Sequence, residues 1–236
     1  MRERLIAEDP RSEEILKPVL RGRDIARYRA NWDGLWLIDT HNGYAGVPPI
    51  NVDDYPAVKA HLDRFIRCLE RRQDKGVTPY NLRNCAYHAK FADEKLVWIE
   101  LAERGRFAYD DTGVFGEATT FVLTGEHLKF LCAVLNSNAL QWYISHHAPT
   151  SGTGDLRWKK VYVETIPIPR LSVENQRPFV ELVDRIIAAK HSDPDADIKA
   201  DEEQIDRLVY ALYGFTEQEN ISLSGKMPGA RTWNNL

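Results

Sequence analysis

The sequence has few cysteines and no long apolar run. Its three cysteines, Cys68, Cys85 and Cys132, are widely spaced and form no CxxC pair. This spacing indicates neither a disulfide framework nor a zinc site, so we expect buried or free thiols. No apolar stretch approaches the roughly 18 residues of a membrane span, and acidic side chains stand where a signal peptide has its apolar core. We therefore expect a cytoplasmic chain with no membrane partner.

The chain also lacks the loops and tetrapeptides that mark nucleotide and methyltransferase sites. It has no GxxxxGK[ST] loop to hold a nucleoside triphosphate and no GxGxxG after a strand. The tetrapeptides Asn-Pro-Pro-Tyr and Asp-Pro-Pro-Tyr, with which amino-methyltransferases hold a flipped base, are missing as well. These absences predict a chain that binds no nucleotide cofactor by itself.

Candidate metal ligands are scarce. His146 and His147 are neighbours on an expected helix, where adjacent side chains point about 100° apart. The two rings are therefore not expected to bind the same metal ion. Three consecutive residues, Asp93–Lys95, cannot all face one metal, and Glu100 has no obvious partner. We predict no metal site and no catalytic residues, so the chain alone is not expected to be an enzyme.

The composition is that of an ordinary globular protein. The 236 residues are 43% hydrophobic and 28% charged, which is enough for a packed core and too apolar for a disordered chain. One large domain, or one domain with an appendage, fits this length.

The net charge of −4 is unevenly distributed. Residues 172–219 hold 12 acidic and 5 basic side chains, so the rest of the chain carries +3. Basic residues are densest between Lys59 and Lys95 and in "RWKK", Arg157–Lys160. Such patches can neutralise phosphates in a chain of negative total charge, since screening removes distant charge beyond about 8 Å. The alternative is an ordinary solvated helix surface.

Alternating elements without internal repeats predict an α/β or α+β fold. Strands are expected at "GLWLIDT" (34–40), "KLVWIEL" (95–101) and "KVYVETIPIP" (160–169). Residues 106–124 are expected to form a hairpin that turns at Asp111 to Gly113, followed by a strand through Phe121 and Leu123. Helices are expected over 51–76, with an apolar stripe from Val58 to Leu69, and over 126–147, 175–191 and 200–215. We expect a mixed sheet with flanking helices and a C-terminal helical appendage.

An ordered series of segments resembles a known family. The series is "LRGRDIARY", "WLIDT", "YPAVKAHLDRF", "RRQDKG", "PYNLR", "KLVWIEL", "RFAYDDTGVF", "LCAVLNSNALQWYI" and "VETIPIP". In this order and spacing, from about Ile15 to Pro169, the segments resemble the TaqI-like C-terminal specificity domain. That family forms the DNA target recognition domain of adenine-specific methyltransferases and of fused restriction-modification enzymes.

The resemblance implies a division of labour with a catalytic domain that this sequence lacks. In such enzymes an N-terminal domain binds S-adenosylmethionine and methylates N6 of a flipped adenine, while the specificity domain selects the sequence. The resemblance therefore implies that this chain recognises double-stranded DNA and takes part in phage defence. The chain would be a piece or a separate subunit of a methyltransferase, and in the fused enzymes the parent would also cleave DNA. We expect a monomer with a recognition domain over 1–170, a helical pair over 171–219 and a flexible tail over 220–236.

The segment "LRGRDIARY" is the first candidate contact with DNA. Gly22 allows a tight turn, Asp24 can cap or pair with a neighbouring arginine, and Ile25 is expected in the core. Arg21 and Arg23 would then project from a fixed loop, where guanidinium suits phosphate or the O6 and N7 of guanine. The alternative is that Arg23 and Asp24 form an internal ion pair that only orders the loop.

Three further groups are candidate DNA contacts. They are Arg71, Arg72, Lys75, Tyr80 and Arg83 near a helix end; Thr119 and Thr120; and Ser151, Thr153, Arg157, Lys159 and Lys160 around a glycine-rich loop. Basic side chains would meet phosphates, and hydroxyls could reach base edges. The alternatives are a solvated helix end and ordinary β-branched strand residues. Trp158 is expected in the core.

A second class of function remains open. The chain could be a protein-interaction scaffold whose acidic C-terminal helices dock a catalytic subunit of a defence system. In that case the basic patches would be incidental, and binding to mixed-sequence duplex would not weaken steeply with salt.

Overall fold

The chain divides into two compact units, each built from segments far apart in the sequence. The computed structural model describes residues 1–216, Glu219 and Leu223. Unit 1 comprises Met1–Leu20, Trp32–Asp93 and Asp111–Glu117, and unit 2 comprises Arg21–Asn31, Glu94–Asp110 and the chain from Ala118 onward. The expected functional limits at residues 170 and 219 stay predictions, and the expected tail lies outside the described residues apart from Leu223.

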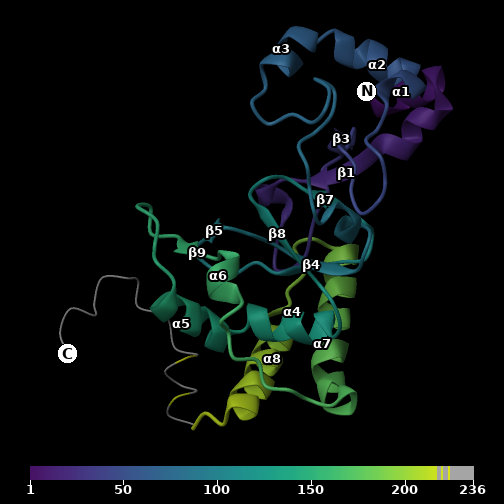
Figure 1. Cartoon of the computed structure of the whole chain (residues 1–236). Coiled ribbons are helices and arrows are strands. Elements are labelled where there is room, and N and C mark those ends of the chain that lie inside the picture. The colour runs from purple at the N-terminus through teal and green to yellow at the C-terminus, as the bar shows by residue number, and fades with distance from the viewer. Residues whose placement is uncertain (217–218, 220–222, 224–236) are drawn as a thin grey trace. The chain divides into compact units, whose positions relative to one another are not determined.

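Unit 1 is built on a three-stranded sheet of order β3-β1-β7 (Figure 1). Strand β1 (Leu16–Leu20) pairs antiparallel with β3 (Trp36–Ile38) and parallel with β7 (Phe115–Gly116). The helices are α1 (Arg2–Glu8), α2 (Pro56–Asp63) and α3 (Ile66–Arg71), with 3-10 turns at Pro10–Ile15, Val52–Asp54 and His88–Phe91. Their apolar side chains form one cluster, which consists of Leu5, Ile15, Leu16, Val52, Ala57 and Val58.

The expected continuous helix over 51–76 is wrong. The segment forms a 3-10 turn and then two short helices, α2 and α3, which are separated at Arg64 and Phe65. Phe65 is 46% exposed, and α3 has no buried residue. Beyond α2 the expected apolar stripe is at most half-buried at Ile66 and Leu69, and with little packing a helix of this length is only marginally stable.

Unit 2 contains a four-stranded sheet of order β2-β6-β4-β8 and a two-stranded ribbon, β5-β9. The sheet strands are β2 (Tyr28–Arg29), β6 (Ala108–Asp110), β4 (Lys95–Ile99) and β8 (Thr120–Thr124), and the ribbon strands are β5 (Leu101–Ala102) and β9 (Leu156–Arg157). Only the β2–β6 pair is parallel within this sheet. A 3-10 turn at Gly22–Asp24 precedes β2.

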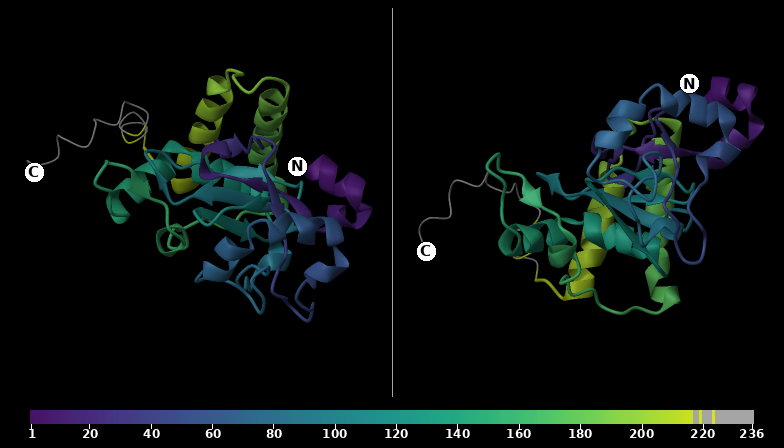
Figure 2. Two further views of the ribbon diagram at one scale, coloured as in Figure 1. Left: turned by 90° about the horizontal axis from the view of Figure 1, so that it is seen from above. Right: turned by 45° about the horizontal axis from the view of Figure 1, so that its top comes forward.

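Five helices complete the described part of unit 2. They are α4 (Leu128–Asn136), α5 (Asn138–His147), α6 (Lys160–Val163), α7 (Val173–Ser192) and α8 (Lys199–Tyr213). Helix α4 packs on the sheet, α7 packs on α4, and α8 packs on α7 and α5. Figure 2 shows α7 and α8 side by side, which confirms the expected C-terminal helix pair. The mixed α/β fold is also confirmed.

The structure corrects three other expected elements. The hairpin expected to turn at Asp111 to Gly113 is wrong, because β6 pairs with β4 and β2 whereas β7 pairs with β1 in the other sheet. The strand expected through Phe121 and Leu123 is confirmed as β8. The expected single helix over 126–147 is split at Ser137, whose hydroxyl caps α5 by accepting a hydrogen bond from Leu140 N at 3.4 Å. The expected strand over 160–169 begins instead with α6, since β9 ends at Arg157 and no described strand pairs with this segment.

Two smaller expectations concern thiols and membranes. All three cysteines are free: Cys68 is exposed, Cys85 is half-buried and Cys132 is buried. Burial raises the pKa of the Cys132 thiol to about 12. In the part of the chain that the structure describes, every helix is too short or too polar to cross a bilayer.

Candidate nucleic-acid interface

The turn at Arg21–Asp24 holds one arginine and exposes another. The Asp24 carboxylate accepts hydrogen bonds from Arg21 N at 2.8 Å, from Arg21 Nε at 3.0 Å and from Arg21 Nη2 at 3.1 Å. Burial alone would raise the pKa of Asp24, but the hydrogen bonds and charge of Arg21 outweigh it and lower the pKa. The side chain of Arg23 is 70% exposed, and its Nε lies 3.9 Å from Asp24 Oδ1.

The tight ion pair therefore belongs to Arg21, which the sequence interpretation expected to project from the loop together with Arg23. The alternative, an ion pair between Arg23 and Asp24, is present only as the longer 3.9 Å contact. Asp24 caps the turn as expected, and Ile25 is buried at 1% exposure as expected. Of the two candidate arginines, Arg23 is the one whose side chain extends into solvent.

In unit 1, the five candidates around α3 divide into exposed and structural side chains. Arg72 donates from Nη2 to Pro79 O at 2.8 Å and to Asn81 O at 2.9 Å, so it holds the following loop. Tyr80 donates its hydroxyl to Asp63. The other three, Arg71, Lys75 and Arg83, are exposed, with Lys75 Nζ bonded to Glu70 O and Arg83 3.5 Å from Asp74.

In unit 2, Glu100 gathers candidates from two separate segments. Its carboxylate lies 3.0 Å from Arg157 Nη1 and 3.4 Å from Lys159 Nζ. Its backbone N–H donates to Thr119 O at 3.3 Å, and its carbonyl accepts from Trp158 N at 2.7 Å. We call Glu100, Arg157 and Lys159 the Glu100 cluster. All three side chains stay between 29% and 44% exposed, so the cluster is reachable from solvent.

Sequence reasoning missed Glu100, which it left without a partner. The ion pair with Arg157 spans 57 residues, and nothing near Glu100 in the sequence indicates it. The hint that was available is that Arg157 and Lys159 alternate about a tryptophan, so that both can face away from the core while Trp158 is buried at 1% exposure.

The loop before this cluster is tied by its own hydroxyls. Ser151 Oγ accepts from the backbone N–H groups of Thr153 and Asp155, at 3.3 Å and 3.1 Å. Thr153 Oγ1 lies 2.7 Å from Ser151 Oγ and donates to Asp155 Oδ2 at 3.1 Å. Lys160, at the start of α6, is exposed and 3.6 Å from Glu164. Thr119 is exposed, and Thr120 of β8 pairs with Ile99 of β4.

The histidine doublet forms two separate aromatic pairs. His146 Nδ1 bonds Trp142 O and His147 Nδ1 bonds Tyr143 O, each one helical turn back. Their rings lie against Trp142 and Tyr143 respectively. Among the described residues, no three His, Cys, Asp or Glu side chains gather closely enough to hold a metal ion.

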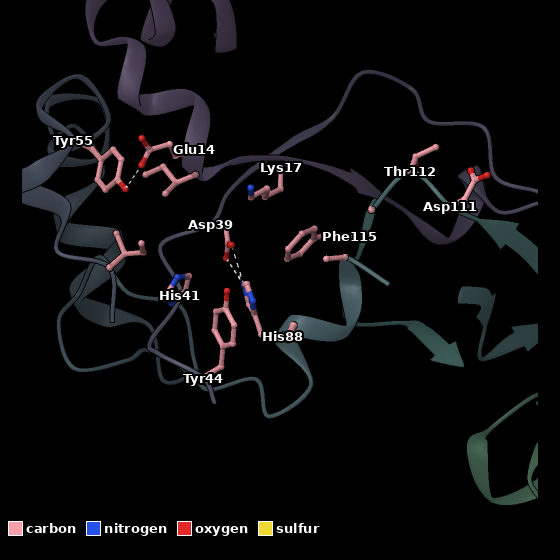
Figure 3. Close-up of a pocket in the computed structure, with 15 residues that line it drawn as sticks. Glu14, Lys17, Asp39, His41, Tyr44, Tyr55, His88, Asp111, Thr112 and Phe115 are labelled. Atoms are coloured by element: carbon pink, nitrogen blue, oxygen red, sulfur yellow. Dashed lines mark hydrogen bonds and ion pairs between the residues drawn. The ribbon is translucent and has the colours of Figure 1, made fainter. Parts of the chain in front are cut away.

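Unit 1 also contains a pocket that sequence reasoning missed. Asp39 accepts from His88 Nε2 at 2.9 Å within it, and the His88 ring stacks on Tyr44 with centroids 4.1 Å apart (Figure 3). The partners come from segments 49 residues apart, so no local pattern predicts them.

The comparisons with known proteins give the family. Residues 17–168 match the model of the TaqI-like C-terminal specificity domain, and the chain belongs to this family. The expected resemblance is thereby confirmed. The curated relatives include the type II methyltransferase M.BstVI of Geobacillus stearothermophilus, 22% identical over 212 residues, and the type II methyltransferase M.PaeR7I of Pseudomonas aeruginosa, 22% identical over 213 residues.

These matches cover most of this chain but a minor part of each relative. They span 87% and 88% of the chain, which corresponds to 35% of each methyltransferase. A solved structure of the type IIL restriction-modification enzyme MmeI in complex with DNA is similar in fold, with a TM-score of 0.65 and 13% identity. That match covers 93% of this chain and 31% of the enzyme.

Proposed function

We propose that this chain recognises a specific sequence in double-stranded DNA, as the specificity part of an adenine-N6 DNA methyltransferase or of a fused restriction-modification enzyme. The observation that carries the proposal is the family match over residues 17–168. The fold likeness to an enzyme solved in complex with DNA supports it. The exposed basic side chains of both units supply the charge that phosphate contacts need.

The candidate contacts divide into two roles in this proposal. The side chains of Arg157, Lys159 and Lys160 reach solvent, the Ser151 loop precedes them in the chain, and the Thr119 backbone is bonded to Glu100. This part of unit 2 could therefore combine phosphate contacts with base reading. Arg23 in unit 2 and the exposed Arg71, Lys75 and Arg83 in unit 1 would add phosphate contacts. By contrast, Arg21, Arg72 and Tyr80 hold the scaffold through internal hydrogen bonds.

The Glu100 cluster has a specific place in this mechanism. Glu100 holds Arg157 and Lys159 in position without DNA, and a phosphate oxygen could replace its carboxylate as their acceptor. Because the side chains are partly ordered beforehand, less conformational entropy is lost when they bind. Glu100 would also repel a misplaced phosphate, which favours one register on the duplex.

Methyl transfer is assigned to a catalytic domain outside the matched region, with S-adenosylmethionine bound there. The purified chain should therefore incorporate no labelled methyl groups into DNA. Labelled DNA after incubation with the chain and S-adenosylmethionine would overturn this part of the proposal.

A fluorescence anisotropy titration with mixed-sequence duplex at two salt concentrations tests DNA binding. We expect affinity to fall steeply with salt, with a slope of about 0.9 per phosphate contact in a plot of log K against log salt. Selection from a random duplex library should then enrich one sequence. Binding that is absent, or insensitive to salt, would contradict the proposal and favour a protein-docking scaffold.

A further inference from the structure

The pocket in unit 1 is not used by the proposed duplex contacts. It is a cavity of about 540 Å³ whose polar and aromatic walls include Glu14, Lys17, Asp39, His41, Tyr44, His88 and Phe115 (Figure 3). None of the candidate DNA contacts from the sequence lines it. The residues come from the 3-10 turn at Pro10–Ile15, from β1, from the segment after β3, from the 3-10 turn at His88–Phe91 and from β7.

Aromatic rings give the pocket flat apolar faces. The rings of Tyr44 and His88 are stacked, with an interplanar angle of 22°. The ring of His41 meets both of them edge-on, at centroid distances of 4.8 Å and 5.0 Å, and Phe115 lies 5.3 Å from His88. Such a set of rings favours a planar aromatic ligand over an aliphatic one.

His41 is a buried donor that faces the pocket. It is 8% exposed, and its Nδ1 accepts a hydrogen bond from Gly43 N at 3.2 Å, so a neutral ring carries its proton on Nε2. Burial lowers the pKa of His41, which favours this neutral form. No described residue accepts a hydrogen bond from Nε2, so an acceptor atom of a ligand could supply the missing partner.

Lys17 and Tyr44 supply further donors. Within residues 1–216, neither the Lys17 ammonium nor the Tyr44 hydroxyl takes part in a hydrogen bond or ion pair, although both line the cavity. Figure 3 shows the Tyr44 hydroxyl on the side of the ring nearer Asp39. Three donors without protein acceptors call for a ligand that has acceptors.

Carboxylates on the same cavity exclude a simple anion. Asp39 is 2% exposed and bonded to His88, Glu14 accepts from the Tyr55 hydroxyl at 3.0 Å, and Asp111 lines the cavity as well. Each carboxylate oxygen keeps a free lone pair for a ligand donor. A phosphate would meet these three carboxylates and one lysine, so its charge is poorly matched.

We propose that this cavity binds a guanine base, either displaced from a nucleic-acid strand or as a free nucleotide. Guanine carries acceptors, O6 and N7, on one edge and donors, N1–H and the N2 amino group, on another. Lys17 and His41 match the acceptor edge, and the carboxylates of Asp39 and Glu14 match the donor edge. Tyr44 stacks on His88 and Phe115 stacks on Phe91, so the opposite face of each ring would take the base.

The match distinguishes guanine from the other bases. Adenine would present its N6 amino group where Lys17 and His41 need an acceptor, which leaves polar groups unpaired. Cytosine and thymine have a single ring and less stacking area. This inference goes beyond duplex recognition and does not depend on it, since a mononucleotide is enough to test it.

Calorimetric titration of the full 236-residue chain with 5′-GMP, 5′-AMP, 5′-CMP, 5′-TMP and inorganic phosphate tests the proposal. We expect GMP to bind at least about tenfold more tightly than AMP. Lys17→Met and Tyr44→Leu should each weaken GMP binding by roughly fivefold or more. Lys59→Met and Tyr87→Leu, the same exchanges outside the cavity in the same unit, should leave it unchanged.

Two further measurements locate the site and its source. In the unmodified chain, GMP should shift the ring NMR signals of His41 and His88 but not those of His146 and His147. This measurement locates the GMP site without any variant, so it holds even if a substitution destabilises the fold.

Single-stranded thymidine oligomers with and without one central guanine separate the two sources of the base. Binding of the guanine oligomer supports a displaced base, and binding of GMP alone supports a free nucleotide. Equal affinity for AMP and GMP, displacement of GMP by phosphate alone, or unmoved His41 and His88 signals would each overturn the proposal.

Discussion

At the scale of single residues, Arg21 and Arg23 show how two neighbouring arginines take different roles. Asp24 is 6% exposed and accepts three hydrogen bonds from Arg21, so the arginine compensates a buried charge. Arg23 lies mostly in solvent and contributes its charge to the surface. Stability should depend on the first side chain and DNA affinity on the second.

We expect Arg23→Ala to weaken duplex binding with little change in melting temperature. Arg21→Ala should instead lower the free energy of unfolding by about 1 to 3 kcal/mol, because Asp24 would stay buried without two of its donors. Thermal melts and anisotropy titrations of both variants check this. A large drop in affinity for Arg21→Ala with an unchanged melting temperature would show that Arg21 is itself a DNA contact.

The lowered pKa of Asp24 also predicts a pH dependence. Because the carboxyl has a lower pKa in the folded chain than in the unfolded chain, its contribution to stability is present above its ordinary value, about 3.9, and is lost as the pH falls further. The free energies of unfolding of the parent and of Asp24→Asn should therefore differ by a steady amount from pH 7 down to about pH 4, and the difference should shrink as the pH falls below that value. A difference in the free energy of unfolding that stays constant as the pH falls below about 4 would contradict the lowered pKa of Asp24.

At the scale of elements, β4 and β6 are joined by a buried ion pair. Lys95 and Asp110 are direct partners in the strand register, with Nζ and Oδ2 2.5 Å apart, and Lys95 is 0% exposed. Removal of one charge would leave the other buried without its counter-ion. The pair joins the two inner strands of the sheet, and Glu100 directly follows one of them, β4.

Lys95→Met should lower the free energy of unfolding by about 3 to 5 kcal/mol. The double variant Lys95→Met/Asp110→Leu should recover much of that stability, since two apolar side chains of similar volume need no compensation. Urea unfolding of the two variants measures both values. A double variant no more stable than Lys95→Met would show that the pair contributes more than mutual neutralisation.

At the scale of the whole molecule, local charge rather than net charge should control DNA binding. The chain has a net charge of −4, yet its acidic residues are concentrated toward the C-terminus. Several of them have internal partners in unit 2: Asp184 pairs with Lys129, and Glu202 pairs with Arg27. The acidic helices are therefore partly neutralised within their own unit.

We expect Lys159→Ala/Lys160→Ala to weaken duplex binding and to reduce the salt slope by up to about 2, because each phosphate that the protein neutralises accounts for about 0.9 of that slope. The control Lys199→Ala/Arg207→Ala removes the same two charges from α8 and should leave the slope unchanged. Anisotropy titrations over a range of salt concentrations measure both slopes. Equal effects of the two double variants would show that binding responds only to net charge.

The amino-acid sequence by itself determined the features that depend on neighbouring residues. It was enough to predict the family, the mixed α/β fold, the strands at 36–38 and 95–99, and the C-terminal helix pair. The capping role of Asp24 was also predictable, because it acts on a residue three positions away. In each case the side-chain pattern acts over one turn or one strand, so the sequence alone contains the relevant interactions.

Only the tertiary structure decided which distant segments meet. Strand pairing separated β6 from β7 although a short turn joins them, and the expected long helix divided at Arg64 and Phe65, beyond which no residue of α3 is buried. Glu100 forms an ion pair with Arg157, which is 57 residues away in the sequence, and Asp39 accepts a hydrogen bond from His88, which is 49 residues away. Such pairs form because the chain buries its apolar surface in one particular arrangement, and no local pattern carries that information.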